Sequence, residues 1–545
     1  MTRRRGSCRG FERPFLVALF VALPSCAFLL DFDELKEGGA AGGASGTGGV
    51  AESGAGGALD AEGGGPDSDA GEAGGLGHGG SDAGAAGSAG AAGSACALDC
   101  DDSDPCTEDR CVLTDDGPEC ERTPLAGLVP DGLDATLEAG RIPQVTVAAG
   151  PDAFYLSAFD VAADDGPEVT FYRVGTQGDA VEAVRRITEI TDTTLAGDPV
   201  SAAALVVDTA QGLRIHAYLG LLREVGSKAR PWRFVFDGSF DVVARAPIGD
   251  SFLVSPLGEH RPDAAKVGGA IWGAWVREDG TIGLHSGGRE APDFTLGSTD
   301  TPAAVLSLIS GLDVALGTPE VPAVLYASHG NGVFAWTEAG GATALTECSP
   351  DPGLYSRTFA VRTSVDGAWL GGWTKLTSAS LASELRAIAC TNTQAGCLAL
   401  GESCEAGSSL PFVRNPAFAE VDLPGDAAGI RYHVWVLPWL DAGGMARLGA
   451  QLMRVDFGEA PGTSEVVFTP IPEPNGGAAG DDSEWLPLVL SEMQTSSEID
   501  FRGPDLAATA IVAPDKALIA WVEPGNPEAT ADALRVRRFH MCLPE

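Results

Sequence analysis

One local pattern returns along most of the sequence and limits the fold more than any other feature. An apolar run leads into a tight turn, and a second run follows that ends in an aromatic residue, as in Ala153-Phe-Tyr-Leu-Ser-Ala-Phe159. Turn residues such as Asn331-Gly332 precede several copies, which is typical of hairpins. The sequence therefore predicts an all-β body. The copies end at Phe159, Tyr218, Trp275, Trp336, Trp373, Trp435 and Trp521.

The spacing of these aromatic residues predicts the architecture. Successive positions are 59, 57, 61, 37, 62 and 86 residues apart, about sixty on average. A strand-rich unit of that order fits one four-stranded blade, so seven copies predict a seven-bladed β-propeller. A small residue precedes six of the seven aromatics, which predicts rings packed between blades that approach closely. The longest step contains the polar, Gly-rich stretch 476–483, where an insertion is expected, and a pair of β-sandwiches is the alternative architecture.

The N-terminus carries an export signal. Five arginines in the first fourteen residues precede the apolar run from Phe15 to Leu23. The run ends in Leu23-Pro24-Ser25-Cys26, which resembles the lipobox of bacterial lipoproteins. The resemblance implies a signal peptide over 1–25 and a diacylglycerol group on Cys26 that makes the membrane a partner. It favours the outer membrane or the cell surface, and ordinary secretion to the periplasm or the medium is the alternative.

A linker and a cysteine-rich module follow. Residues 26–95 contain a long stretch of Gly, Ala, Ser, Asp and Glu, which predicts a disordered linker spanning about 40 Å. Residues 96–125 include Asp101-Asp-Ser-Asp-Pro-Cys-Thr-Glu-Asp-Arg-Cys111, which resembles the D-D-G-N-P-C-T-x-D-x-C repeat of exported bacterial surface proteins. Ser103 and Asp104 depart from that repeat. So short a module has no core of its own and depends on cross-links.

The cysteines predict a bridge between the module and the body, which spans 126–545. Ten of the twelve are disulfide candidates: Cys96, Cys100, Cys106, Cys111, Cys120, Cys348, Cys390, Cys397, Cys404 and Cys542. Five lie in each part, so complete pairing requires an odd number of bridges between the parts. Propeller closure is expected to place the C-terminal run 534–539 beside residues 142–147. We therefore expect Cys542 to supply the bridge.

Charge and motifs exclude several function classes. The chain has 35 Lys and Arg against 76 Asp and Glu, a net charge of -41, which excludes nucleic acid as an expected partner. The sequence signs of serine hydrolases, zincins and P-loops are absent. We predict no catalytic, cofactor-binding or metal site. The alternative is a calcium site formed by acidic residues of the module, although their spacing favours a solvated loop: Asp99, Asp101, Asp102, Asp104 and Asp109.

The histidines and one acidic turn receive structural roles. His216 and His433 stand two positions before a repeat aromatic, so they share its strand face and are predicted to pack between blades. Three others are predicted in or near turns without a catalytic role: His260, His285 and His329. The stretch Ser364-Val-Asp366-Gly-Ala-Trp369 resembles an Asp-box of sialidases but is one residue too short, and it predicts a hairpin turn.

Two functions fit this sequence. The first is a non-enzymatic cell-surface or periplasmic lipoprotein that displays a propeller to protein or carbohydrate partners. The alternative is an exported propeller enzyme, a polysaccharide hydrolase or lyase, whose acidic residues converge only in the fold. Two carboxylates about 5–10 Å apart across the centre of the propeller would favour the enzyme.

Overall fold

The fold is known from a computed structural model, which describes residues 98–544 apart from segments between strands. The longest of these segments are 310–322, 400–416, 472–487 and 494–506, and residues 1–97, with Cys26 and Cys96, also lie outside the described residues. All described elements are β-strands, which confirms the all-β prediction. Within this part of the chain no helix is long and apolar enough to cross a membrane.

The cysteine module forms a separate hairpin at the start of the described chain. It consists of β1 (Thr107–Thr114) and β2 (Gly117–Pro124), which pair antiparallel with Cys111 opposite Cys120. Half of the side chains of β1 and nearly all of those of β2 are exposed, and none of either strand is buried. A two-stranded ribbon of this kind is marginal in water without further support, so its stability depends on cross-links.

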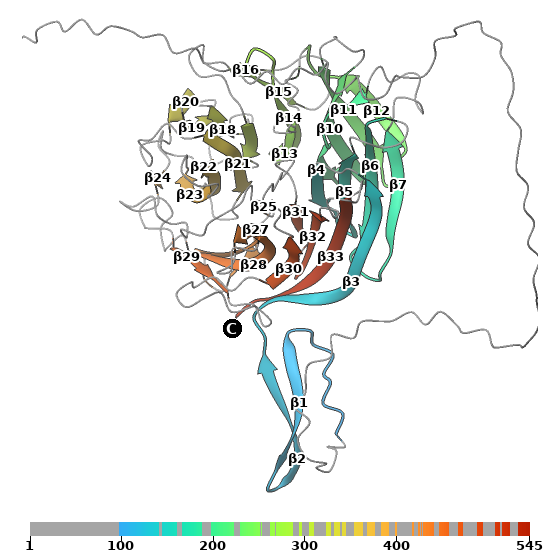
Figure 1. The fold of residues 1–545 in the computed structure, drawn as a ribbon, viewed down its shortest axis with the longest axis vertical. Helices are drawn as coiled ribbons and strands as arrows, with labels where there is room; N and C mark the ends of the chain where they lie inside the picture. Colours follow the sequence, from blue (N-terminus) through green and yellow to red (C-terminus); the bar gives the residue numbers. More distant parts are fainter. Residues whose placement is uncertain are drawn as a thin grey trace, which may run out of the picture. The chain divides into compact units, whose positions relative to one another are not determined.

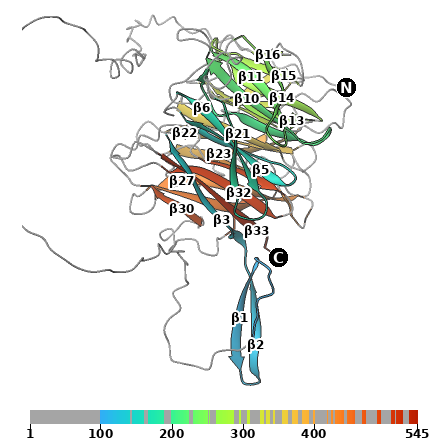
Figure 2. The same cartoon turned by 90° about the vertical axis from the view of Figure 1, so that its right-hand side faces the viewer.

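Seven further antiparallel sheets occur among the described residues (Figures 1 and 2). The first contains β4 (Gln144–Ala149), β5 (Ala153–Asp160), β6 (Glu168–Gly175) and β7 (Val181–Ile187). The second contains β8 (Asp198–Pro199), β9 (Ala204–Asp208), β10 (Arg214–Leu222), β11 (Ala229–Asp237) and β12 (Val242–Pro247). The third contains β13 (Asp263–Val267), β14 (Ala270–Val276), β15 (Ile282–Ser286) and β16 (Phe294–Leu296).

The remaining four sheets follow the same plan. The fourth contains β17 (Val305–Ile309), β18 (Ala323–Ser328), β19 (Gly332–Thr337) and β20 (Gly341–Ala344). The fifth contains β21 (Leu354–Arg362), β22 (Ala368–Leu376), β23 (Ser383–Thr391) and β24 (Leu398–Ala399). The sixth contains β25 (Ala417–Phe418), β26 (Leu423–Pro424), β27 (Ile430–Leu440), β28 (Ala446–Asp456), β29 (Val467–Pro470) and β30 (Leu488–Met493). The seventh, here called the terminal sheet, contains β3 (Gly127–Gly140), β31 (Ala507–Val512), β32 (Lys516–Glu523) and β33 (Asp532–Cys542).

Each of the seven sheets contacts its two neighbours through one strand, here called its first strand. The contacts run from β4 to β9, β13, β17, β21 and β25 in turn, then to β31 of the terminal sheet, and β31 also contacts β4. Apolar side chains fill the spaces between successive sheets wherever side chains are described. The core is therefore divided into layers between sheets, and it is not a single central cluster.

The terminal sheet joins the two ends of the body, but not through the strand that the sequence indicated. The C-terminal strand β33 pairs with β3, while residues 144–149 form β4 of the next sheet. The expectation that the C-terminal run lies beside 142–147 is therefore wrong by one strand. The reason lies in β3 itself, where the pairing register shifts between Pro130 and Asp134 and interrupts the apolar alternation that marks a strand.

The seven repeat aromatics lie in seven different sheets. Six occupy the second strand of their sheet, counted from the strand that contacts the neighbouring sheets, and Trp336 lies in the third strand, β19. The second strand of that sheet, β18, carries the buried Tyr326 instead. This displacement of Trp336 along the chain explains the short step of 37 residues that follows it.

The long step before Trp521 contains an interrupted strand. Both β29 and β30 pair with β28, β29 with Met453–Asp456 and β30 with Ala446–Ala450. Residues 472–487 stand between the two short strands and include the predicted insertion at 476–483, which lies outside the described residues. One outer strand position is thus shared by two segments, which accounts for the length of this repeat.

A repeat aromatic and the small residue before it point to opposite faces of their sheet. Phe159 packs in the layer shared with the second sheet, whereas Ala158 packs in the layer shared with the terminal sheet. Ala520 and Trp521 are divided between two layers in the same way. Because successive side chains of a strand point to opposite faces, each pair contributes to two inter-sheet layers.

Candidate functional site at the seam of the terminal strands

The acidic residues of the hairpin module fold its loop upon itself. Asp101, Asp102 and Asp104 each accept a hydrogen bond from the backbone N–H two residues further on, at 2.8–2.9 Å. The bond from the N–H of Asp104 lowers the pKa of the Asp102 carboxyl. Arg122 pairs with Asp102 at 3.0 Å and with Asp109 at 3.5 Å. The carboxylates of this acidic loop are thus hydrogen-bonded to the loop's own backbone and paired with Arg122. No group of three or more potential metal ligands occurs in the described part of the chain.

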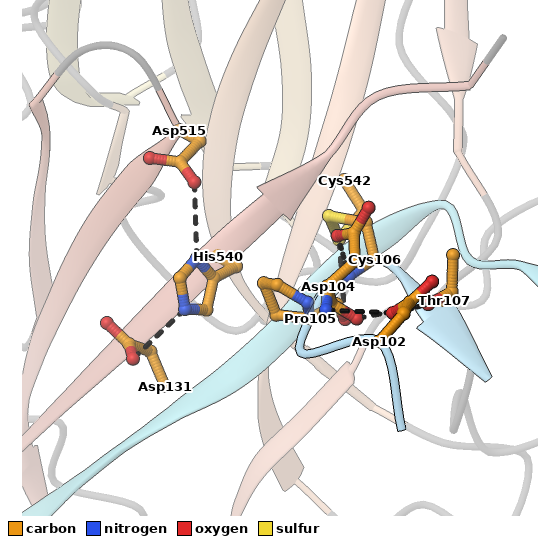
Figure 3. The surroundings of a disulfide bond; sticks show 9 residues. All are labelled: Asp102, Asp104, Pro105, Cys106, Thr107, Asp131, Asp515, His540 and Cys542. Atoms are coloured by element: carbon orange, nitrogen blue, oxygen red, sulfur yellow. Dashed lines mark hydrogen bonds and ion pairs between the residues drawn. A yellow bond between two sulfur atoms is a disulfide. The ribbon is translucent and has the colours of Figure 1, made fainter. Parts of the chain in front are cut away.

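Disulfides cross-link the hairpin and join it to the body. Cys100 bonds to Cys120 within the module, and Cys106 bonds to Cys542 across 436 residues of sequence (Figure 3). Cys111 is also disulfide-bonded. The Cys106–Cys542 bridge runs between the two groups of cysteines, as their parity requires. Cys390 lies in β23 opposite Trp369, and the other body cysteines lie outside the described residues: Cys348, Cys397 and Cys404.

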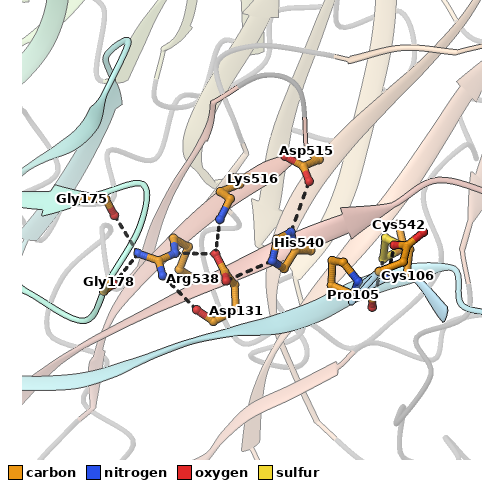
Figure 4. Close-up of polar contacts among 11 residues, drawn as sticks. Pro105, Cys106, Asp131, Gly175, Gly178, Asp515, Lys516, Arg538, His540 and Cys542 are labelled. Carbon is orange, nitrogen blue, oxygen red and sulfur yellow. Dashed lines mark hydrogen bonds and ion pairs between the residues drawn. A yellow bond between two sulfur atoms is a disulfide. The ribbon is translucent and has the colours of Figure 1, made fainter. Parts of the chain in front are cut away.

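A cluster of charged side chains lies beside this bridge on the seam between β3 and β33. Its centre is Asp131 of β3, and its other members, which with Asp131 form the Asp131 cluster, are Asp515, Lys516, Arg538 and His540 (Figure 4). One carboxylate oxygen of Asp131 accepts from Lys516 Nζ at 2.7 Å and from Arg538 Nε at 2.6 Å. The other lies 3.0 Å from His540 Nε2.

Arg538 extends the cluster into the neighbouring sheet. Its side chain is only 3% exposed, and its guanidinium donates to the backbone oxygen of Asp131 at 3.0 Å. The same guanidinium donates to the carbonyl oxygens of Gly175 and Gly178 at the β6–β7 turn, both at 2.8 Å. A buried arginine is stable only when its donors find acceptors, and here they hold three segments together.

His540 lies between two carboxylates. Its Nε2 faces Asp131, and its Nδ1 lies 3.2 Å from the Asp515 carboxylate, on the turn before β32 (Figures 3 and 4). The backbone oxygen of Asp515 also accepts from the N–H of Met541 at 2.6 Å. The strand end that carries Cys542 is therefore fixed on both sides by polar contacts.

The charge balance of the cluster keeps Asp131 ionised. Burial raises the pKa of its carboxyl, but hydrogen bonds from Lys516 and Arg538 outweigh burial, and the net pKa lies below the ordinary value. Both carboxylate oxygens already accept from cationic or histidine donors. Asp131 is therefore engaged through both carboxylate oxygens and is suited to fastening β3 onto β33.

We expect Asp131→Asn to lower the free energy of unfolding by about 2–3 kcal/mol at pH 7, because the amide leaves Arg538 and Lys516 without their counterion. The folded pKa of Asp131 is lowered, so its contribution is present above the unfolded value of about 3.9 and is lost as pH falls through the folded value. Urea unfolding at pH 7 and at pH 3 measures both effects, and the difference between variant and wild type should shrink at pH 3.

Asp134→Asn is the matched control, because Asp134 lies on the same strand but pairs with Arg537 at a more exposed position. We expect a loss below about 1 kcal/mol there. Equal losses in the two variants would contradict a special role for Asp131.

The predicted blade-packing histidines are buried. Burial lowers the pKa of His216 to about 4 and that of His433 to about 3. His285, expected near a turn, instead lies in β15 opposite Gly273 and is fully buried. The sequence did not reveal this strand, because β15 has only five residues and shows no clear alternation. His260 and His329 lie outside the described residues.

The Asp-box-like stretch lies between two paired strands. β21 and β22 run antiparallel with Arg362 opposite Trp369, and residues 363–367 connect them outside the described residues. The pairing is that of a hairpin.

An ion pair joins the second and third sheets. Lys266 Nζ of β13 lies 2.7 Å from the carboxylate of Asp208 in β9, so the charge of Asp208 is balanced by a lysine of the neighbouring sheet.

The sequence alone did not predict the Asp131 cluster. A signal was present, since Arg535, Arg537, Arg538 and His540 concentrate basic side chains at the end of a strongly acidic chain. The partner Asp131 is 407 residues away from Arg538, and no local pattern connects them. The basic run indicated a contact with acidic side chains but did not identify them.

Comparison with known proteins finds similar solved structures but no match by sequence. No protein-family model matches the chain, and no curated protein matches it either. A Penicillium chrysogenum alpha-L-arabinanase complexed with arabinobiose is similar in structure with a TM-score of 0.40 and 9% identity, over 75% of this chain and 99% of that one. RRP9 WD40 repeats give 0.39 and 9% over 75% and 99%. A Fusarium graminearum alpha-L-arabinofuranosidase gives 0.39 and 7% over 74% and 98%.

Proposed function

We propose that this chain is a non-enzymatic exported lipoprotein, anchored through lipid on Cys26, that displays a β-propeller to protein or carbohydrate partners. The observation that carries the proposal is the Cys106–Cys542 disulfide. Such bonds form and persist in oxidising compartments outside the cytoplasm. The bridge also joins the N-terminal part of the chain covalently to the last strand of the body, which suits a domain held at the end of a tether.

The displayed body is proposed to be a closed propeller of seven blades. The contacts between first strands support this arrangement, since they lead from β4 through six other sheets and back through β31. The terminal sheet supports it as well, because it combines a strand from before β4 with three strands from the C-terminus. Each of the seven sheets would be one blade, and β3 would complete the last.

The anchor is tested by mass spectrometry of the N-terminal peptide from the membrane fraction. We expect Cys26 to carry diacylglycerol, and we expect Cys26→Ala to move the protein to the soluble fraction. Cys8→Ala is the matched control, because Cys8 lies in the predicted signal peptide and should leave both lipid and membrane association unchanged. A free N-terminus on a soluble wild-type protein would contradict the anchor and favour ordinary secretion, for which an exported enzyme becomes the better hypothesis.

A further inference from the structure

The Cys106–Cys542 bridge divides the chain at a particular place. Cys106 stands before both the hairpin and β3, and the backbone N–H of Leu125 donates to the oxygen of Cys106 at 2.8 Å. The hairpin therefore begins and ends at one point, beside the bridge. Gly127, the first residue of β3, pairs with Cys542, the last residue of β33. Two routes thus lead from Cys106 into the body, one along the backbone through β3 and one through the sulfur atoms into β33 (Figure 3).

We propose that this bridge is a mechanical fastening that carries tension from the N-terminal segment into β33 and keeps β3 from being peeled off the terminal sheet. The inference rests on the proposed function, in which the N-terminal segment is tethered and the body is held by a partner. The Cys100–Cys120 disulfide gives tension a way past the hairpin, but that way leads only to β3, seven residues further on. Because Gly127 pairs with Cys542, the Cys106–Cys542 bridge limits how far β3 can be drawn away from β33 before the bridge becomes taut and takes the tension.

The position of β33 explains why this route resists tension better. The terminal sheet has the order β3-β33-β32-β31, so β3 is its outermost strand and β33 is paired on both sides. Tension entering at β3 would act on hydrogen bonds to one neighbour. Tension entering at Cys542 acts on a strand that both β3 and β32 hold. Under tension the hydrogen-bonded residue pairs of a hairpin separate one after another, whereas the disulfide gives way only when its covalent S–S bond breaks.

The Asp131 cluster distributes tension away from the loaded end of β33. His540, two residues before Cys542, contacts both Asp131 of β3 and Asp515 on the turn before β32. Arg538, two residues further along, contacts the β6–β7 turn of the first sheet through Gly175 and Gly178 (Figure 4). A pull on Cys542 is therefore shared within four residues by the terminal sheet and its neighbour.

Single-molecule pulling on the full oxidised chain tests this fastening. One handle is attached at the N-terminus and the other at Glu278, an exposed residue of the turn between the central strands β14 and β15. In the Cys106→Ser/Cys542→Ser variant the tension passes through Cys100–Cys120 into β3. We expect an added early step of up to roughly 80 Å, the extended length of the chain from Cys120 to β4, at about 3.3–3.6 Å per residue. The wild-type protein should lack this step before the body unfolds.

The Cys100→Ser/Cys120→Ser variant is the control, because it loses a disulfide of the same module but keeps the bridge to β33. It should behave like the wild type. A step of this length in the oxidised wild type, or its absence from the Cys106→Ser/Cys542→Ser variant, would overturn the proposal. Because the handle replaces the lipid, the result is independent of whether Cys26 is acylated, and failure of the membrane anchor would not affect it.

Discussion

Gly273→Ala should lower the free energy of unfolding by about 3 kcal/mol, a large effect for a single methyl group. A Cβ atom at Gly273 in β14 would lie 2.2 Å from Cε1 of Tyr218, which is far inside van der Waals contact. Tyr218 belongs to β10 of the neighbouring sheet and is fully buried, so its ring has no open space to move into. Overpacking of a dense core costs roughly 1–3 kcal/mol, and a contact this short falls at the upper end. Chemical unfolding of the purified variant measures the loss.

Tyr218→Leu provides the control for this contact. The smaller side chain leaves room at Gly273, so Gly273→Ala in that background should cost less than about 1 kcal/mol. The coupling between the two positions then measures the close approach of the second and third sheets. Additive losses in the double variant would show that the cost arises within β14 and not between sheets.

The seven repeat aromatics fall in seven different sheets because the pattern depends on a contact of this kind. Close approach of two sheets needs a large ring on one side and little or no side chain on the other, as Tyr218 and Gly273 show. That requirement appears in the sequence as an aromatic residue near small ones, once per sheet. This sequence pattern does not determine which strand carries the ring, because either strand of a hairpin can place a ring in the space between two sheets. Trp336 in β19 is the example.

The seam of the terminal strands could not be predicted in the same way. The terminal sheet is assembled from both ends of the body, so the partners of Arg538 and Cys542 lie hundreds of residues away. The odd number of cysteines in both the module and the body indicated that a bridge joins the two parts, because such a count does not depend on local sequence. The choice of Cys106 depends on where the hairpin ends relative to β33. That position is set by tertiary packing and leaves no trace in local sequence.

The protein should lose stability as pH falls below about 6.5, before most carboxylates are protonated, and the buried His433 should be one of two main causes. Its side chain is fully buried in β27, and neither ring nitrogen has a hydrogen-bond partner within the described structure. Burial lowers its pKa to about 3, against about 6.5 in an unfolded chain. The unfolded state therefore binds a proton between these values while the folded state does not. Stability is full above about pH 6.5 and decreases as pH falls toward 3.

The expected loss from His433 is on the order of 3 kcal/mol at pH 4, since each pKa unit of difference corresponds to about 1.4 kcal/mol. His216, whose pKa is lowered to about 4, should add a loss of similar size, also about 3 kcal/mol at pH 4. Unfolding of wild type and His433→Leu from pH 7 to pH 4 measures the effect, and the variant should show the flatter dependence. Asp131→Asn separates carboxylate titration from histidine titration, because its effect on the pH dependence lies below about pH 4, where the carboxylate protonates. Parallel losses for wild type and His433→Leu between pH 6.5 and 4 would mean that His433 accepts a proton without unfolding, so that the layer beside β27 must admit water.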